Sequence, residues 1–207
     1  SLVNFLGQER DILFPDELNA HRIRIQHPIL NKSEFHKVEA LDGDFKTKKL
    51  SILFDAKKGG LEKAVEKLCE DAINAIKNGF DILVLTDRNV SKEKAAIPSL
   101  LAVSAVHIST VRAGIRKRAS LVLETAEARE VDHFAVLSGF GCDAVYPYLA
   151  YATIESMVEE GEIDVAITKD EAIKNYLKAN IAELLKIFSK MGISTLQSYQ
   201  GAQIFEA

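Results

Sequence analysis

The chain has 207 residues, of which 47% are hydrophobic and 27% are charged, and its formal net charge is −4. These proportions exclude a disordered tail and are typical of a globular domain with its own core. Asp and Glu outnumber Lys and Arg, 30 to 26, and no apolar run approaches the roughly 20 residues that span a bilayer, so neither nucleic acid nor a membrane is an expected partner.

The cysteines and the chain ends narrow the class further. Cys69 and Cys142 form no CxxC pattern and the five histidines are scattered, so the sequence predicts no metal site and a reducing compartment, the cytoplasm. The chain starts at Ser1, and its last residues, 203–207, are still apolar and patterned. This favours a segment of a longer, multidomain protein.

Residues 1–48 lack a clean hydrophobic periodicity, and the His27–Pro28 step interrupts any helix there. We expect an extended N-terminal arm that packs on the rest of the domain, with one short helix near Lys32–Lys37. The α/β domain itself is expected to occupy residues 49–207.

From Lys49 onward, short apolar runs alternate with stretches of helical periodicity. The run at 81–87 is continuously apolar at its centre, which is typical of a parallel strand covered on both faces. The stripe on the first long helix lies beside Cys69, which we expect to be buried. The expected elements are strand 50–54, a break at Gly59–Gly60, helix 61–78, strand 81–87, helix 97–113, strand 120–124, helix 127–138, strand 143–146, a helix opened by Pro147, and helix 170–191.

Strand–helix–strand crossovers are nearly always right-handed, so these repeated βα units predict a parallel sheet. Only four strands are convincing, whereas a closed barrel needs eight strands in about 250 residues. The expected fold class is therefore α/β, with a parallel sheet that resembles an incomplete or distorted TIM barrel.

Two helix-to-strand joints repeat the same pattern. Gly79-Phe80-Asp81 and Gly141-Cys142-Asp143 each place one residue between a glycine and an aspartate that opens a strand. We expect each aspartate to accept hydrogen bonds from backbone amides at the start of the sheet. That role is structural, because ligand sites in such folds lie at the carboxyl ends of the strands.

The carboxyl ends of the strands carry a candidate polar cluster. Asp87, Arg88, Glu124, Arg129 and Tyr146 follow or end three of the expected strands. An arginine between two acids can bind a polar ligand or perform acid–base chemistry. The alternative is a charge network that holds the loops in place.

Other candidates are weaker. Gly59–Gly60 precedes a helix without a G-x-G-x-x-G or G-K-[ST] pattern, so nucleotide binding is not expected. His107 and His133 lie in expected helices, where a lone histidine is either a general base or, more often, a packed or capping residue. The basic group Arg112, Arg116, Lys117 and Arg118 surrounds Gly114 and suits either an anion or the C-terminus of a helix.

Several long segments together resemble the central domain of the glutamate synthase large (alpha) subunit. The resemblance covers nearly the whole chain and is weakest in the first forty or so residues. The chain departs from the family pattern at Ile108, Ser109, Tyr146 and Gln200. The segments that carry the resemblance are Leu83–Arg88, Ile97–His107, Leu123–Ala135, Gly141–Ala150, Ser189–Tyr199 and Gly201–Glu206.

The resemblance implies a role inside a larger cytoplasmic enzyme that makes two glutamates from glutamine, 2-oxoglutarate and a reductant. In that family an amidotransferase domain releases ammonia, and a domain with FMN and a 3Fe–4S cluster uses it. A small electron-delivering subunit or ferredoxin is a further implied partner. The central domain has no catalytic residue and no cofactor of its own; it links the two active domains and helps to form the ammonia tunnel.

We expect the tail to contact the flavin domain and the tunnel, because small polar residues after the last helix suit a passage for ammonia. Two alternatives remain open: a free-standing barrel-like enzyme that acts on a small anionic metabolite through Asp87, Arg88 and Glu124, and an interaction module whose arm, 1–48, holds a partner. The tail residues are Ser189, Lys190, Met191, Gly192, Ser194, Thr195, Gln197, Ser198 and Tyr199.

Overall fold

A computed structural model of the chain describes residues 1–10, 13–14, 16–57, 60–164 and 166–205. Gly59 of the expected break, Glu206 at the end of the resembling tail and Ala207 lie outside these ranges. Gly60 adopts a left-handed backbone (φ 104°) immediately before a helix, so the expected break holds for that residue.

The centre of the fold is a parallel sheet of four strands whose spatial order follows their order in the chain. One helix connects each strand to the next, which confirms the repeated βα units, and the described residues form no closed barrel. The sheet consists of β3 (Thr47–Ser51), β5 (Ile82–Thr86), β7 (Ser120–Glu124) and β8 (Ala144–Tyr146), with α2 (Leu61–Lys77), α3 (Ser99–Arg112) and α4 (Val131–Gly139) between them.

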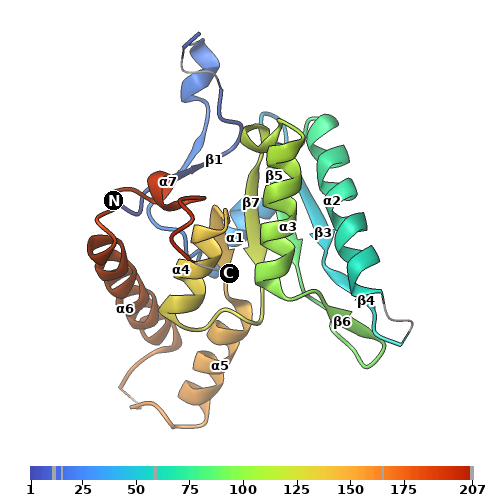
Figure 1. Cartoon of the computed structure of the whole chain (residues 1–207). Coiled ribbons are helices and arrows are strands. Elements are labelled where there is room, and N and C mark those ends of the chain that lie inside the picture. The colour runs from blue at the N-terminus through green and yellow to red at the C-terminus, as the bar shows by residue number, and fades with distance from the viewer. Residues whose placement is uncertain (11–12, 15, 58–59, 165, 206–207) are drawn as a thin grey trace.

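Helices cover both faces of this sheet. Figure 1 shows α2, α3 and α4 on the near face and α1 (Lys32–Glu39) behind it. All residues of β5 and β7 are buried. This explains why their sequences are continuously apolar rather than alternating, because no side of either strand meets water.

The N-terminal arm is extended and wraps around one edge of the sheet. Its strands β1 (Asn4–Leu6) and β2 (Ile23–Ile25) pair antiparallel, and η1 (Glu17–Ala20) projects away from the sheet at the top of Figure 1. The amide of Leu30 donates to the Val145 carbonyl at 2.8 Å, so the arm closes the free edge of β8. The helix expected near 32–37 is confirmed as α1. The division of the chain at residue 48 stays a prediction.

The expected strand 50–54 is wrong in one respect, because two strands meet there. Ile52, fully buried, donates its amide to the Thr86 carbonyl and accepts from the Ile97 amide. The chain thus leaves the parallel sheet at Ile52 and continues as β4 (Leu53–Asp55), which pairs antiparallel with β6 (Lys94–Ala96). β6 is not among the elements expected from the sequence, because its three residues are too few for a periodic pattern.

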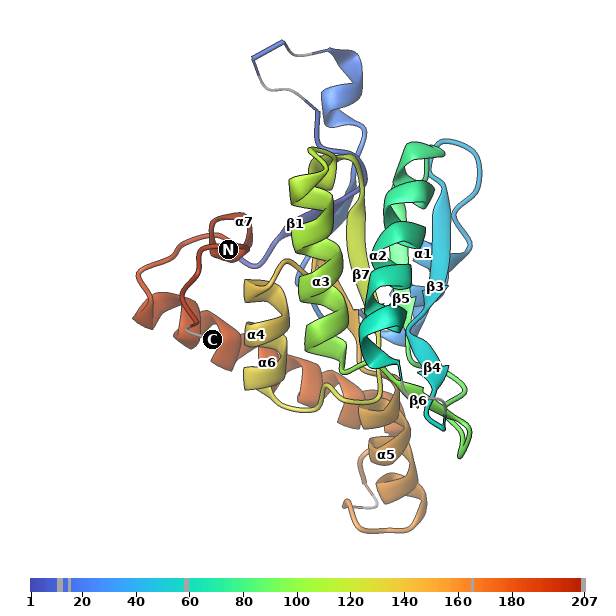
Figure 2. The ribbon, with the colours of Figure 1, turned by 45° about the vertical axis from the view of Figure 1, so that its right-hand side comes forward.

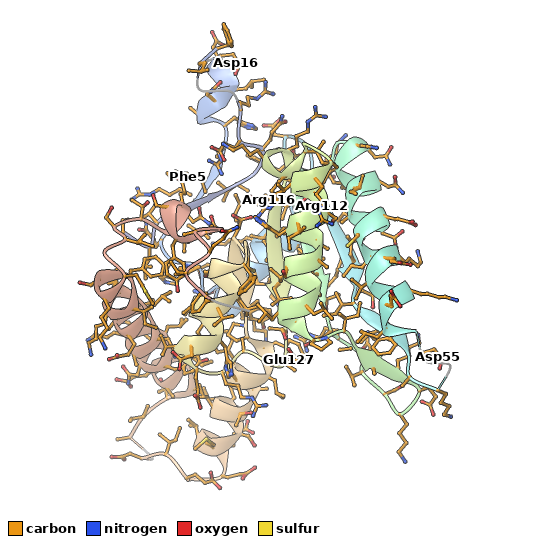
Figure 3. The ribbon with its side chains drawn as sticks, viewed as in Figure 1. Phe5, Asp16, Asp55, Arg112, Arg116 and Glu127 are labelled. Carbon is orange, nitrogen blue, oxygen red and sulfur yellow. The ribbon has the colours of Figure 1, made fainter. Side chains whose placement is uncertain are left out.

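The expected helix 127–138 begins four residues later, at Val131. Glu130 and His133 form a capping box at that point. Glu127 instead accepts a hydrogen bond from the Ser99 amide (2.9 Å) at the start of α3. Figure 3 shows Glu127 at the opposite end of α3 from Arg112 and Arg116. Cys69, expected to be buried, is half-buried beside the α2 stripe.

The C-terminal part of the chain forms a second, smaller core with the first residues of the arm. Leu2 packs with Leu184, Phe188, Leu196 and Tyr199, and both ribbon views place the N-terminus beside α7 (Figure 2). This smaller core is formed mainly by α6 (Lys169–Lys190) and α7 (Leu196–Tyr199). The remaining elements are α5 (Tyr148–Glu159), which precedes α6, and η2 (Arg116–Arg118), which lies between α3 and β7.

Both aspartates of the repeated joints do what the sequence predicts. Asp81 accepts the amide of Lys46, which precedes β3, at 2.9 Å. Asp143 accepts the amide of Leu121, in β7, at 2.7 Å. Each carboxylate therefore ties the start of its strand to the neighbouring strand.

Gly141→Ala should destabilise the chain strongly. Gly141 has φ +99°, and an added Cβ would lie 2.1 Å from His107 Nδ1. We expect a loss of about 3 kcal/mol in the free energy of unfolding, from backbone strain plus steric displacement of the imidazole. Denaturant unfolding measures it.

Gly161→Ala is the matched control. Gly161 also has positive φ (+75°), but its Cβ would meet nothing within 4 Å. The Gly161→Ala variant should lose only about 1 kcal/mol in the free energy of unfolding, from backbone strain alone. Equal losses in the two variants would contradict the role of the close approach to His107.

Candidate functional site

Glu124, the last residue of β7, is the centre of the polar cluster at the carboxyl ends of the strands. Its side chain is 3% exposed. It accepts hydrogen bonds from Thr86 Oγ1 (2.8 Å), Arg88 Nε (2.7 Å) and Lys49 Nζ (2.8 Å). Burial alone would raise the pKa of Glu124, but the hydrogen bonds from Lys49, Arg88 and Thr86 outweigh it and hold that pKa below its ordinary value.

Lys49 connects this cluster to α1. Its ammonium also pairs with Glu39, the last residue of α1. Partial burial opposes the charged form of Lys49, but the two carboxylates raise its pKa above the ordinary value. The buried carboxylate is therefore matched by two cations that are themselves anchored.

Asp87 is also committed to structure. It is 2% exposed, and its Oδ2 accepts from Thr125 Oγ1 and from the Ala126 amide, each at 2.8 Å. Thr125 in turn lies 2.7 Å from the Ser99 hydroxyl at the start of α3. These contacts hold the loops after β5 and β7 against one helix.

The structure brings four of the five cluster residues together. Arg88 lies between Glu124 and the ring of Tyr148, whose centre is 3.5 Å from the guanidinium carbon. Tyr146 ends β8 and stacks on Phe35 of α1, with ring centres 4.3 Å apart. Burial raises the pKa of Tyr146, and burial together with Asp87 raises the pKa of Tyr148 to about 12.

Arg129 is not part of this cluster. Its amide donates to His133 Nδ1 (3.1 Å) and its carbonyl accepts from the Tyr176 hydroxyl (2.7 Å). Within the described residues no contact joins its side chain to Glu124. Because residues 125–130 are a loop and not the first turns of a helix, Arg129 is carried away to the N-terminus of α4.

A cleft of about 800 Å³ opens beside Arg88, between α1, α5 and α6. Its residues mix aromatic rings with both signs of charge. The Tyr151 hydroxyl is committed to the Leu30 carbonyl at 2.8 Å. The lining residues are Asn31, Lys32, Ser33, His36, Arg88, Tyr146, Tyr148, Tyr151, Ala152, Glu155, Asp170, Ile173, Lys174 and Leu177.

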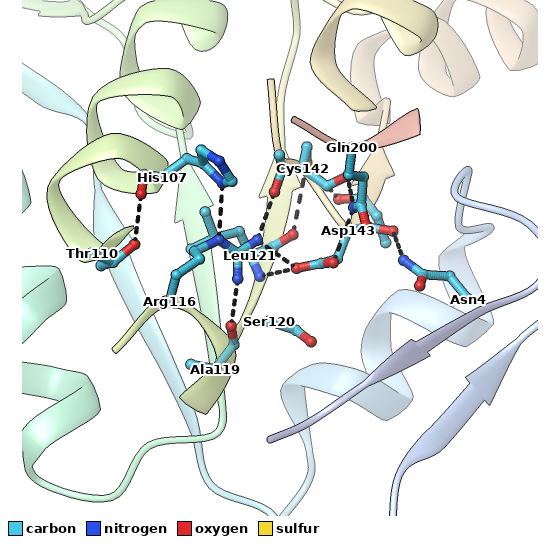
Figure 4. Close-up of polar contacts among 12 residues, drawn as sticks. Asn4, His107, Thr110, Arg116, Ala119, Ser120, Leu121, Cys142, Asp143 and Gln200 are labelled. Carbon is cyan, nitrogen blue, oxygen red and sulfur yellow. Dashed lines mark hydrogen bonds and ion pairs between the residues drawn. The ribbon is translucent and has the colours of Figure 1, made fainter. Parts of the chain in front are cut away.

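A second network lies at the amino ends of the strands, opposite the Glu124 cluster, and is centred on Arg116 and Asp143 (Figure 4). Arg116 donates to His107 Nδ1 (3.0 Å), to the carbonyls of Ala119 and Gly141 (2.7 Å each), and to Asp143 Oδ2 (3.0 Å). Arg116, one of the four basic residues around Gly114, therefore forms a specific ion pair with Asp143. Arg112 lies in the last turn of α3, as the alternative interpretation expects.

Both ends of the chain attach to Asp143. Asn4 of β1 donates to its carbonyl (3.0 Å), and Gln200 after α7 donates to its Oδ1 (3.0 Å) and to the Cys142 carbonyl (2.9 Å). Gln200, a departure from the family pattern, therefore has a structural role here. Burial raises the pKa of the Cys142 thiol, which keeps it protonated.

The two helical histidines are both structural. His133 Nδ1 accepts from the Glu130 amide at 3.1 Å and caps α4. His107 accepts from Arg116, which requires a neutral imidazole nitrogen. Burial, and then the charge of Arg116, lower the pKa of His107 below its ordinary value.

The tail has an exposed side and a buried side. Ser189 and Lys190 end α6, Gly192 adopts φ 68°, and Thr195 caps α7 by accepting from the Ser198 amide. Exposed positions are Met191, Gly192, Ser194, Thr195, Gln197 and Ser198. Tyr199 is fully buried and stacks on Phe188, with ring centres 4.0 Å apart. The contact of this segment with another domain stays a prediction.

The described residues contain neither a metal-binding cluster nor a membrane-spanning helix. No three His, Cys, Asp or Glu side chains there are arranged to hold a metal ion. None of the described helices combines the length and apolar character needed to cross a membrane.

Glu124→Gln should reduce the free energy of unfolding at neutral pH by about 3 kcal/mol, because it leaves Lys49 and Arg88 beside a neutral amide. Since the pKa of Glu124 is lower in the folded chain than its ordinary 4.5, its contribution is present above that value and is lost as the pH falls through the folded pKa. Acid unfolding of the variant should therefore depend less on pH. Glu93→Gln, at a side chain 63% exposed, is the control and should change stability by no more than about 0.5 kcal/mol.

His107→Gln tests the other network. Because folding lowers the pKa of His107, its neutral form stabilises the chain above the ordinary value of 6.5, and that stability is lost as the pH falls below it. Gln can still accept from Arg116 but does not titrate. Unfolding curves at about pH 7.5 and about pH 5.5 should differ less for the variant than for the unmodified chain. An unchanged difference would show that another group causes it; His21→Gln controls for the loss of an exposed imidazole.

Comparison of the sequence with known proteins identifies the family. The chain matches the family model for the glutamate synthase central domain over residues 1–207. It is 42% identical to the glutamate synthase [NADPH] large chain of Bacillus subtilis, 40% identical to the glutamate synthase [NADH] of Schizosaccharomyces pombe and 39% identical to the ferredoxin-dependent glutamate synthase 2 of Synechocystis. All of the chain is covered in each case, but only 13%, 10% and 14% of the relatives. The chain belongs to the glutamate synthase central domain family.

Proposed function

We propose that the chain is a non-catalytic domain of a glutamate synthase and links its glutaminase domain to its synthase domain. The observation that carries this proposal is the state of the buried carboxylates. Glu124 is held through both carboxylate oxygens by two cations and a hydroxyl. Asp87 is held through Oδ2 by a hydroxyl and an amide, and its Oδ1, which has no hydrogen-bond partner among the described residues, is buried in a side chain 2% exposed. Neither carboxylate is therefore placed to reach a substrate as a general acid or base. These contacts do not support the alternative of a free-standing enzyme that uses Asp87 and Glu124 for catalysis.

The parent enzyme would convert glutamine and 2-oxoglutarate, with a reductant, into two glutamates in the cytoplasm. Its FMN and 3Fe–4S cluster belong to another domain of the same polypeptide. Iron–sulfur clusters are held by cysteine thiolates, and this chain has two cysteines, of which Cys142 is fully buried with a raised thiol pKa. These residues do not fit a cluster. The relatives are named for NADPH, NADH and ferredoxin, so a small electron-delivering subunit or ferredoxin is the class of further partner.

The tail is the part of the chain that we assign to the ammonia tunnel and the domain contact. Ser194, Thr195, Gln197 and Ser198 present small or neutral polar groups at the surface. Such groups neither protonate nor strongly retain ammonia. The buried side chain of Tyr199 anchors this exposed segment to α6 by stacking on Phe188.

Ser194→Trp in the full-length enzyme tests the tunnel. Ser194 is exposed and its side chain holds no cap, so the change should leave the fold intact. We expect glutamine-dependent glutamate formation to fall about tenfold, with ammonia-dependent formation retained, because only the former needs ammonia to pass between domains. Steady-state assays with each nitrogen source measure both.

Thr153→Trp, at an exposed position on α5, is the matched control and should leave both activities unchanged. A parallel fall of both activities in Ser194→Trp, or no fall in either, would contradict the tunnel role. The spacer role is tested separately: the 207-residue chain, incubated with FMN, glutamine, 2-oxoglutarate and a chemical reductant, should bind no FMN and form no glutamate.

A further inference from the structure

The cleft beside Arg88 has a feature that the spacer role does not use. The guanidinium of Arg88 is fixed on two sides: its Nε donates to the buried Glu124, and its plane lies over the Tyr148 ring. In the described part of the chain, no hydrogen bond or ion pair engages its two terminal nitrogens. Its side chain is 43% exposed and lines the cleft.

An arginine held in this way is prepared to receive an anion. Two parallel N–H groups of a guanidinium match the two oxygens of a carboxylate. Because Glu124 and Tyr148 already restrict the side chain, little conformational entropy remains to be lost on binding. A freely rotating surface arginine would lack this advantage.

Charged side chains of both signs lie around the cleft, so anion recognition depends on the two terminal nitrogens of Arg88 and not on a net charge. Lys32, Arg88 and Lys174 supply three permanent cations against the two carboxylates of Glu155 and Asp170. His36, also on the wall, is engaged with Glu39 at 3.2 Å. Glu124, the buried ion-pair partner of Arg88, brings the carboxylates to three, so the charges in and directly beside the cleft balance.

The remaining walls suit a small organic molecule. Tyr146 lines the cleft, and among the described residues its hydroxyl has no hydrogen-bond partner. The volume of about 800 Å³ lies within the usual range for small-molecule sites. The cleft also lies at the carboxyl ends of the parallel strands, where ligands of such sheets bind.

We propose that this cleft binds a small carboxylate anion, held by the two terminal nitrogens of Arg88. Lys32 and Lys174 add long-range attraction, and the Tyr146 hydroxyl donates to the same ligand. The site binds and does not catalyse, because Asp87 and Glu124 remain committed to the loops. This proposal does not depend on the spacer role and is tested on the 207-residue chain.

Succinate is the probe, titrated at constant ionic strength and followed by isothermal calorimetry. Arg88→Gln should weaken binding by about tenfold or more. Lys67→Gln removes the same charge from α2, at a side chain 72% exposed, and should change the dissociation constant by less than about twofold. Equal binding by the unmodified chain and Arg88→Gln, or the absence of saturable binding, would overturn the proposal.

A second pair of variants leaves Arg88 and Glu124 intact. Ala152 is exposed on α5 and lines the cleft, so its replacement should not disturb folding. Ala152→Glu should weaken succinate binding about fivefold, whereas Ala152→Lys should not weaken it. Similar losses in both would show steric exclusion and contradict recognition by charge.

Inorganic phosphate distinguishes a carboxylate site from a general anion site. Succinate and glutamate should both protect the chain against thermal unfolding, and Arg88→Gln should abolish this shift. Phosphate at equal ionic strength should give a smaller shift. A phosphate shift as large as that of succinate, or one that persists in Arg88→Gln, would contradict the assignment.

Discussion

The ion pair between Arg116 and Asp143 is the interaction on which the arrangement of the chain depends. Their side chains are only 16% and 11% exposed, so each charge requires a partner. Arg116 donates to His107 of α3 and to two carbonyls that precede β7 and β8. Asp143 accepts the Leu121 amide. The arm and the tail then attach to the same aspartate, through Asn4 and Gln200. Segments almost two hundred residues apart in the chain thereby meet at one residue, Asn4 at its backbone carbonyl and Gln200 at its carboxylate.

The carboxyl ends of the strands are held together by a different set of contacts. There a buried carboxylate, Glu124, collects two cations, and Asp87 collects a hydroxyl and an amide. Both oxygens of Glu124 and the Oδ2 of Asp87 are engaged in this way, and these bonds hold the loops after β5 and β7 in position. A domain built in this way offers stable surfaces to its neighbours. Arg88 is the exception, because among the described residues only the Nε of its guanidinium donates a hydrogen bond, and the rest of the guanidinium faces a cleft.

The sequence was informative where burial imposes a pattern. β5 and β7 are buried on both faces, and α2 has one apolar stripe, so their positions follow from hydrophobic runs and helical spacing. The aspartates of the two joints were also predictable, because each follows a glycine that ends a helix. Prediction was poor where tertiary hydrogen bonds override local preference. β3 ends before Ile52 because the Ile52 carbonyl accepts the amide of Ile97, which follows β6, and Glu127 caps α3 and does not begin α4.

By itself the sequence determined the βα repeat, the number of strands in the main sheet, the family resemblance and the residues that gather at the strand ends. Only the tertiary structure decided what those residues do. It excluded Arg129 from the cluster, placed Tyr199 in the core and left the terminal nitrogens of Arg88 facing a cleft. The physical reason is that periodicity reports burial along one element, whereas a polar side chain acquires its role from donors and acceptors on other elements. Lys49, Arg88 and Glu124 lie in three separate segments of the chain, and their mutual contacts exist only after the sheet has formed.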